Sequence, residues 1–142
     1  MVKQITVFIE NKPGRLMEML KALAKNDIDI KAFSLADTTE FGIARMIVSD
    51  ENAAKKAIDD EGVVARICNI ITIAVPDEPG ALMKALEILK NNGISIEYMY
   101  AFAEKLDGAS VIAIRTDNQE LADETLSKGG VKVLNQSDIE KL

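Results

Sequence analysis

The sequence repeats itself at an offset of 66 residues. Residues 9–17 (IENKPGRLM) recur as residues 75–83 (VPDEPGALM), and the leucines, asparagines and isoleucines that follow recur at the same spacing. Further along, the offset drifts to 68, so short insertions separate the two halves. A period of this kind indicates the duplication of one folding unit. The sequence therefore predicts two related domains, residues 1–68 and residues 69–142.

Each half is predicted to contain a strand, a helix, two strands, a second helix and a final strand. Residues 3–9 are rich in β-branched side chains and alternate in character, which is typical of a strand. Leu16, Leu20 and Leu23 then recur at helical spacing, as do their counterparts in the second half. The other strands are predicted at residues 28–37, 42–49, 63–67, 94–103, 108–115 and 131–134, the second helices around residues 53–58 and 121–126, and the central turns at residues 37–40 and 104–108.

The ends of the first helices are predicted from capping residues. Asn11 and Asp77 are favourable N-cap types, and Pro13 and Pro79 fit a first helical turn, where the missing N–H costs little. These residues predict that the helices begin at Asn11 and Asp77, and the asparagines that follow each leucine stripe suit their C-terminal ends. Near the end of the chain, Ser137 is a capping type and predicts a terminal helical turn.

This order of elements predicts an α+β fold of two ferredoxin-like βαββαβ units. Right-handed crossovers place both helices of a unit on one face of a four-stranded antiparallel sheet. Residues 46–48 and 111–114 are apolar on both alternating faces, a pattern expected where both sides of a strand are buried. The two halves can cover one another, and a second copy of the chain can complete the burial. We therefore expect an isologous homodimer.

The composition argues against several classes of protein. The chain has no histidine and a single cysteine, Cys68, so the commonest general base and the usual metal ligands are missing, and we expect no catalytic residues, metal or cofactor. A formal net charge of −6 argues against nucleic acid as a partner. The longest aliphatic run, residues 70–75, is far shorter than the roughly 20 residues that span a bilayer. With no secretory signal visible at the amino terminus, a cytoplasmic location is expected.

Two short segments at the predicted helix starts match each other closely, NKPGRL at residues 11–16 and DEPGAL at residues 77–82. Set after a strand and within a duplicated βαββαβ unit, this motif resembles that of the ACT domain. The resemblance covers almost the whole chain. It implies that the domains bind small effectors, usually amino acids, and regulate enzymes such as aspartate kinase, acetohydroxyacid synthase or prephenate dehydratase. With no catalytic domain beside them, the chain resembles a free-standing tandem ACT protein.

The helix starts are also candidate binding sites on physical grounds. A helix N-terminus presents unpaired N–H groups and partial positive charge, so the backbone there can bind a ligand carboxylate. The resemblance implies a pocket between this loop and the second strand, often across a domain or subunit interface. The candidate ligand-binding residues are Asn11, Pro13, Gly14, Arg15, Leu16 and Ser34 in the first half, and Asp77, Glu78, Pro79, Gly80, Ala81, Leu82, Tyr98 and Tyr100 in the second.

The two candidate sites differ in sequence. Arg15 corresponds to Ala81, and it can either bind a carboxylate through two hydrogen bonds or occupy the first pocket and close it. Tyr98 and Tyr100 point to one face of their strand, where they either wall a pocket or pack in an interface. We expect the two sites to be non-equivalent, with the loop at residues 77–82 favoured.

The leading functional hypothesis is a non-catalytic sensor that binds a free amino acid at an interface between ACT domains. A related alternative is a dissociable regulatory subunit of an amino-acid biosynthetic enzyme such as acetohydroxyacid synthase. An alternative of a different class is a small enzyme that uses paired carboxylates, for example Glu10 with Glu97 or Asp77 with Glu78. The sequence does not select the amino acid: an apolar pocket suits a branched or aromatic side chain, whereas tyrosine hydroxyls and Glu97 suit a polar or cationic one.

Overall fold

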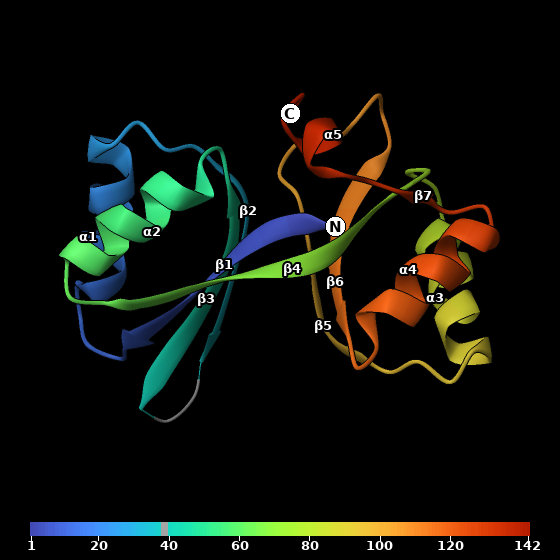
Figure 1. Cartoon of the computed structure of the whole chain (residues 1–142), viewed down its shortest axis with the longest axis horizontal. Helices are drawn as coiled ribbons and strands as arrows, with labels where there is room; N and C mark the ends of the chain where they lie inside the picture. Colours follow the sequence, from blue (N-terminus) through green and yellow to red (C-terminus); the bar gives the residue numbers. More distant parts are fainter. Residues whose placement is uncertain (38–39) are drawn as a thin grey trace. The chain divides into compact units, whose positions relative to one another are not determined.

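The chain separates into two compact units, which are shown in Figure 1. The computed structural model describes residues 1–37 and 40–142. One unit consists of residues 3–68, and the other consists of residues 69–142 together with Met1 and Val2. The predicted turn at residues 37–40 lies partly outside the described residues.

The unit of residues 3–68 has the strand order β2-β3-β1-β4. Strand β3 pairs antiparallel with β1 on one side and with β2 on the other. Its elements are β1 (Val2–Glu10), α1 (Arg15–Lys25), β2 (Ile30–Asp37), β3 (Phe41–Val48), α2 (Glu51–Asp60) and the first part of β4 (Val64–Val75).

The unit of residues 69–142 repeats this arrangement with the strand order β7-β4-β6-β5. Strand β4 pairs antiparallel with β6 and with β7, and β5 pairs antiparallel with β6. Besides the second part of β4, its elements are α3 (Ala81–Asn91), β5 (Ile96–Ala101), β6 (Ser110–Thr116), α4 (Gln119–Lys128), β7 (Lys132–Val133) and the short α5 (Gln136–Ile139).

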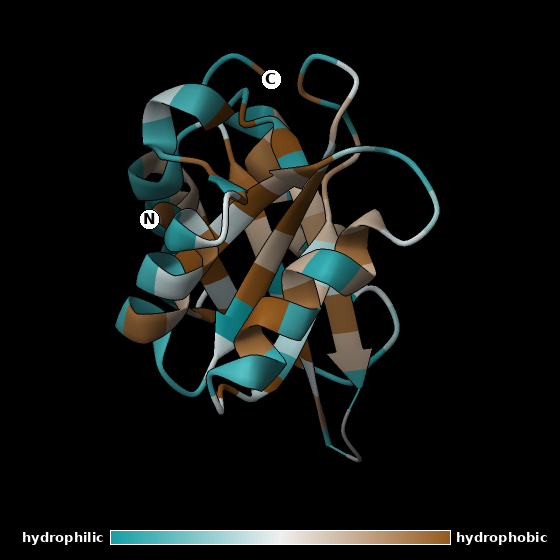
Figure 2. Cartoon of the chain, turned by 90° about the vertical axis from the view of Figure 1, so that its right-hand side faces the viewer, coloured by the Kyte–Doolittle hydropathy of each residue, from teal (hydrophilic) through white to brown (hydrophobic). Residues whose placement is uncertain are grey.

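Each unit has its own hydrophobic core between the sheet and its two long helices. In the first unit, alternate residues of β1 such as Ile5 and Val7 pack with Leu23 of α1 and Ile58 of α2. In the second unit, the core is built from the corresponding residues of β4, β6, α3 and α4. Figure 1 shows α1 and α2 on the same side of their strands, and α3 and α4 likewise. Figure 2 shows that hydrophobic residues predominate along the strands.

The α+β class and the two ferredoxin-like units predicted from the sequence are confirmed. Asn26 and Asn92 are the C-caps of α1 and α3, as their positions suggested. The terminal helical turn is also present, although its N-cap is Asn135, whose side chain accepts a hydrogen bond from the Asp138 N–H.

The predicted starts of the first helices are wrong. Helix α1 begins at Arg15 and α3 at Ala81, four residues after the asparagine and aspartate proposed as caps. The N-cap positions are occupied by Gly14 and Gly80, whose φ angles are 85° and 84°. Only glycine adopts this left-handed backbone readily, so the proline that precedes it belongs to a turn before the helix.

The core of the first unit gives a direct test of this packing. Leu23 of α1 is 1% exposed, so Leu23→Ala is expected to lower the free energy of unfolding by about 2–5 kcal/mol through lost burial and a residual cavity. Met17 lies on the same helix and is 61% exposed, so Met17→Ala should change the free energy of unfolding by about 0.5 kcal/mol or less. Urea denaturation of both variants measures the difference, and equal effects would contradict the assignment of the buried face.

Candidate ligand-binding site

A tight turn leads into the first helix of each unit. In the first unit, Arg15 N–H donates to the Lys12 carbonyl at 3.3 Å, with Pro13 and Gly14 between them. In the second unit, Ala81 N–H donates to the Glu78 carbonyl at the same distance. Proline at the second position and a left-handed glycine at the third define a type II turn. The Pro-Gly pair therefore fixes how the chain enters α1 and α3.

This turn leaves the N-termini of α1 and α3 without a side-chain cap. The other helices are capped, because Asp50, Asn118 and Asn135 each accept a hydrogen bond from a backbone N–H of the first turn of α2, α4 or α5. Glycine has no side chain that could do the same at α1 and α3. Among the described residues, none accepts a hydrogen bond from the backbone N–H groups of Leu16 and Met17 in α1. These donors and the helix dipole can bind an anion.

A cavity of about 230 Å³ lies beside the uncapped end of α1. The loop that follows β1 forms one wall and the end of β2 forms another. Asn11 joins the two walls, because its side-chain amide donates to Asp37 at 3.4 Å. The backbone N–H of Asn11 also donates to the Glu40 carbonyl at 3.2 Å. The cavity is lined by Ile9, Glu10, Asn11, Lys12, Leu16, Leu35, Asp37 and Gly42.

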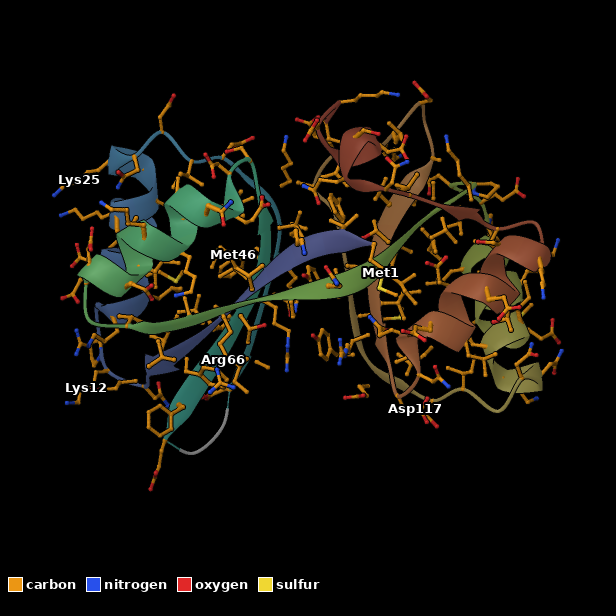
Figure 3. All side chains as sticks on the ribbon, viewed as in Figure 1. Met1, Lys12, Lys25, Met46, Arg66 and Asp117 are labelled. Atoms are coloured by element: carbon orange, nitrogen blue, oxygen red, sulfur yellow. The ribbon has the colours of Figure 1, made fainter. Side chains whose placement is uncertain are left out.

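The charged groups of this loop are paired with one another. Glu10 accepts from Lys12 at 3.1 Å and lies 3.8 Å from the guanidinium of Arg15, which also contacts Glu18 at 3.1 Å. The hydrogen bond from Lys12, followed by the charges of Lys12 and Arg15, lowers the pKa of Glu10 below its ordinary value of 4.5. Arg15 does not line the cavity, and its guanidinium lies between two carboxylates. Figure 3 labels Lys12, which extends outward from this loop.

The loop of the second unit has a different partner. Asp77, which corresponds to Asn11, accepts from the ammonium of Lys105 at 2.5 Å. This hydrogen bond and the charge of Lys105 lower the pKa of Asp77 below its ordinary value of 3.8. Lys105 comes from the turn between β5 and β6, so the ion pair ties the two loops of this unit together.

The candidates on the second strands lie on the other face of their sheets. Ser34 is aligned with Arg45, whereas its neighbour Leu35 is aligned with Ala44 on the face that carries the core and the cavity. Tyr98 and Tyr100 share one face, as the sequence predicted, and Tyr100 is aligned with Ala113 rather than with the core residue Ile114. The structure therefore brings Asn11 and Leu16 together with Leu35 and Asp37, and it does not bring Ser34 to them.

Six residues of the cavity were not among the sequence candidates. Each has a signal in the sequence that could have indicated it. Ile9 ends the first predicted strand, Glu10 and Lys12 flank the motif residue Asn11, and Gly42 begins the third predicted strand. Leu35 and Asp37 lie an odd number of residues from Ser34, so their side chains point to the opposite face of the strand. Only the pairing of β2 with β3 shows which set of alternate residues of β2 points toward the cavity.

The carboxylate pairs considered for catalysis are all exposed. Acid–base work by a carboxyl near neutral pH needs a raised pKa, which burial or repulsion supplies. The pKa values of Glu10 and Asp77 are instead lowered by their lysine partners. Among the residues that the structure describes, no group of three or more His, Cys, Asp or Glu side chains could hold a metal ion. Within those same residues, no helix has the length and apolar character needed to span a membrane.

Comparison with known proteins places this geometry in a family. The model of the ACT domain pair matches residues 1–142, so the chain belongs to the ACT domain pair family. The crystal structure of protein BT0572 from Bacteroides thetaiotaomicron is similar, with 40% sequence identity, a TM-score of 0.90, and coverage of 99% of this chain and 96% of that one. Among curated proteins, none matches the sequence.

Regulatory subunits of aspartate kinase share the fold at much lower identity. The ligand-free subunit from Thermus thermophilus is 17% identical, with a TM-score of 0.59 and coverage of 89% of this chain and 91% of that one. The subunit from Thermus flavus is 18% identical, with the same TM-score and coverage of 90% and 92%. These likenesses support the architecture of two ACT units.

The Asp77–Lys105 pair predicts a titration result. Removing the ammonium with Lys105→Met should raise the pKa of Asp77 toward 3.8, because the hydrogen bond and the charge that lower it are lost. The contribution of the pair to stability is present above pH 3.8 and disappears as the pH falls through the lowered pKa of the folded state. Carboxyl NMR titration measures the change. Lys90→Met is the matched control, and an equal shift in that variant would refute the pairing.

Proposed function

We propose that this protein is a non-catalytic sensor that binds a free amino acid at the loop between β1 and α1. The α-carboxylate of the ligand accepts hydrogen bonds from the uncapped N–H groups of α1. The ammonium group lies against Asp37, and the ligand side chain packs on Leu16 and Leu35. The observation that carries this proposal is that an uncapped helix N-terminus, a carboxylate and two leucines lie around one small cavity.

The chemistry of the cavity suits a small zwitterion. A helix N-terminus stabilises a nearby anion by about 0.3–1 kcal/mol when exposed and up to about 2 kcal/mol when partly buried. Asp37 supplies the opposite charge on the other wall, which orients the ligand. Sites for drug-sized ligands measure about 300–1,000 Å³, so a cavity of about 230 Å³ suits a smaller molecule.

We place the primary site in the first unit, although the sequence favoured the loop at residues 77–82. The support is the ion pair at Asp77, because its carboxylate already has a cationic partner in Lys105. In the first unit the corresponding Asn11 carries no charge, and it holds Asp37 at the cavity wall. The second loop keeps its uncapped helix start, so it remains a candidate for a weaker site.

Membership of the ACT domain pair family supports a regulatory role. The cytoplasmic location expected from the sequence is part of the same proposal. The solved structures that share the fold include regulatory subunits of aspartate kinase and a structure of the aspartokinase alpha and beta subunits. By analogy, ligand binding here would change the affinity for a biosynthetic enzyme. The alternative hypothesis is a dissociable regulatory subunit. In that case the pocket is completed by the partner enzyme and is incomplete in the isolated chain.

The sensor hypothesis predicts a ligand-specific thermal shift. One of the twenty amino acids, at a hundred times its Kd, should stabilise the fold by about 2.7 kcal/mol and raise Tm by several degrees. Differential scanning fluorimetry of the purified chain measures this shift. The absence of a Tm shift with all twenty amino acids would contradict the sensor hypothesis and favour the hypothesis of a regulatory subunit.

Two substitutions locate the site of that shift. Gly14→Asp places a carboxylate at the N-cap of α1, where it competes with the ligand for the free N–H groups. It should abolish the shift, whereas Gly14→Ala imposes a comparable backbone strain without the carboxylate and should preserve it. Gly80→Asp makes the same change at α3. Loss of the shift in Gly80→Asp, with retention in Gly14→Asp, would move the site to the second loop.

We further propose that the protein is a homodimer that uses a groove beside α3. The groove measures about 690 Å³ and contains Glu87 and Lys90, neither of which has an ion-pair partner among the described residues. A twofold axis would place Glu87 of each copy against Lys90 of the other, so the surface is complementary to itself. Its apolar residues are Leu82, Met83, Leu86, Ile94 and Ile96.

The proposed dimer predicts the effect of a charge in this groove. Analytical ultracentrifugation at micromolar concentration should give a dimer for the natural chain and a monomer for Met83→Asp, because Met83 is 64% exposed in the groove. Met17 is the corresponding residue of α1 and is also exposed, so Met17→Asp should remain dimeric. A monomeric natural chain would refute the dimer, and dissociation by Met17→Asp alone would move the interface to α1.

A further inference from the structure

The two units contain corresponding depressions of very different size. Each lies between the start of the first helix and the turn that ends in the last strand of the unit. In the first unit this depression measures about 170 Å³, and in the second unit it measures about 410 Å³. Neither coincides with the cavity proposed above for the amino acid, which lies on the β2 side of the loop.

Three side-chain replacements contribute to the difference in size. At corresponding positions, large residues of the first unit are replaced by alanine in the second, while the surrounding backbone pattern is the same. The replacements are Phe8 by Ala74, Arg15 by Ala81 and Met19 by Ala85. These truncations leave a hollow floored by short aliphatic side chains, within the size range of small-molecule sites.

A glycine on the opposite wall keeps the depression open. Gly129 follows α4, and a Cβ at this position would lie 2.5 Å from Cδ1 of Ile88. Ile88 lines the depression, so a larger residue at position 129 would force it to move. The absence of a side chain here allows the aliphatic wall to form.

The charged residues of this depression differ from those of the first unit, where Glu10 and Arg15 line the depression and pair with each other. Lys84 and Lys132 line the depression of the second unit, whereas the corresponding residues of the first unit are Glu18 and Val64. Glu78 lies at the same depression. Among the described residues, none of these three charged side chains has an ion-pair partner within 4.0 Å. Two unpaired ammonium groups above an aliphatic floor favour an anion with an apolar body.

We propose that the depression between α3 and β7 binds a small aliphatic carboxylate, held by Lys84 and Lys132. The carboxylate pairs with the two ammonium groups, and the aliphatic body packs on Ala74, Ala85 and Ile88. This site is separate from the amino-acid site of the first unit and does not depend on it. The same chemistry is present in an aliphatic 2-oxo acid and in the corresponding amino acid, whose ammonium group would pair with Glu78.

Titration calorimetry of the full chain with 4-methyl-2-oxopentanoate and with leucine tests the site. At least one probe should bind, and Lys84→Met should lower the affinity for that probe roughly tenfold or more, because a hydrogen bond between charged groups is lost. Lys84→Arg should retain binding. Lys21→Met removes the same charge from an exposed position of α1, outside the depression, and should have no effect.

Further variants separate the ligand sources and the sites. Glu78→Gln should weaken the binding of leucine, because the ammonium group of leucine loses its partner. The affinity for the 2-oxo acid should be unchanged or higher in this variant. Ala81→Leu fills the depression and should abolish binding, whereas Gly14→Asp should preserve it even if the amino-acid site is lost. The proposal is overturned if neither probe binds, if Lys84→Met and Ala81→Leu have no effect, or if Lys21→Met weakens binding equally.

Discussion

Each unit enters its first helix through a Pro-Gly turn. The left-handed backbone of this turn requires glycine at the N-cap position, and this determines whether the first N–H groups of the helix are capped. Because Gly14 and Gly80 have no side chain, they cannot cap the helices that they precede. The first N–H groups of α1 and α3 therefore stay available, while the other helices satisfy theirs with Asp or Asn. The sheet then places a second strand beside this loop, so a turn that starts a helix also builds one wall of a cavity.

Duplication gave the chain two copies of this scaffold, and side-chain volume and charge make them different. In the first unit, Arg15 and its acidic partners fill one side of the loop, and the cavity lies on the other side. In the second unit, Lys105 engages Asp77, and Ala81 leaves open the side that Arg15 occupies. The backbone pattern is conserved between the units while the binding surface changes, which is how sites diverge on a repeated fold.

The fold could be predicted from the sequence because it depends on periodicity and on the repeat. The helix starts could not, since Asn11 followed by Pro13 and Gly14 fits both a capped helix and a type II turn, and only the φ angle of the glycine distinguishes them. The loop of the site was predicted from its motif, but its second wall was not. Choosing Leu35 over Ser34 requires the register between β2 and β3, and a one-residue shift reverses which side chains face the cavity.

In the proposed complex, the backbone at the start of α1 binds the ligand carboxylate. The most direct measurement is a ¹H–¹⁵N NMR titration of the full chain with the amino acid that stabilises it. The amides of Gly14, Leu16 and Met17 should shift most, because new hydrogen bonds form at N–H groups that are otherwise free. Saturable binding that leaves these amides unchanged while others shift would contradict this binding mode.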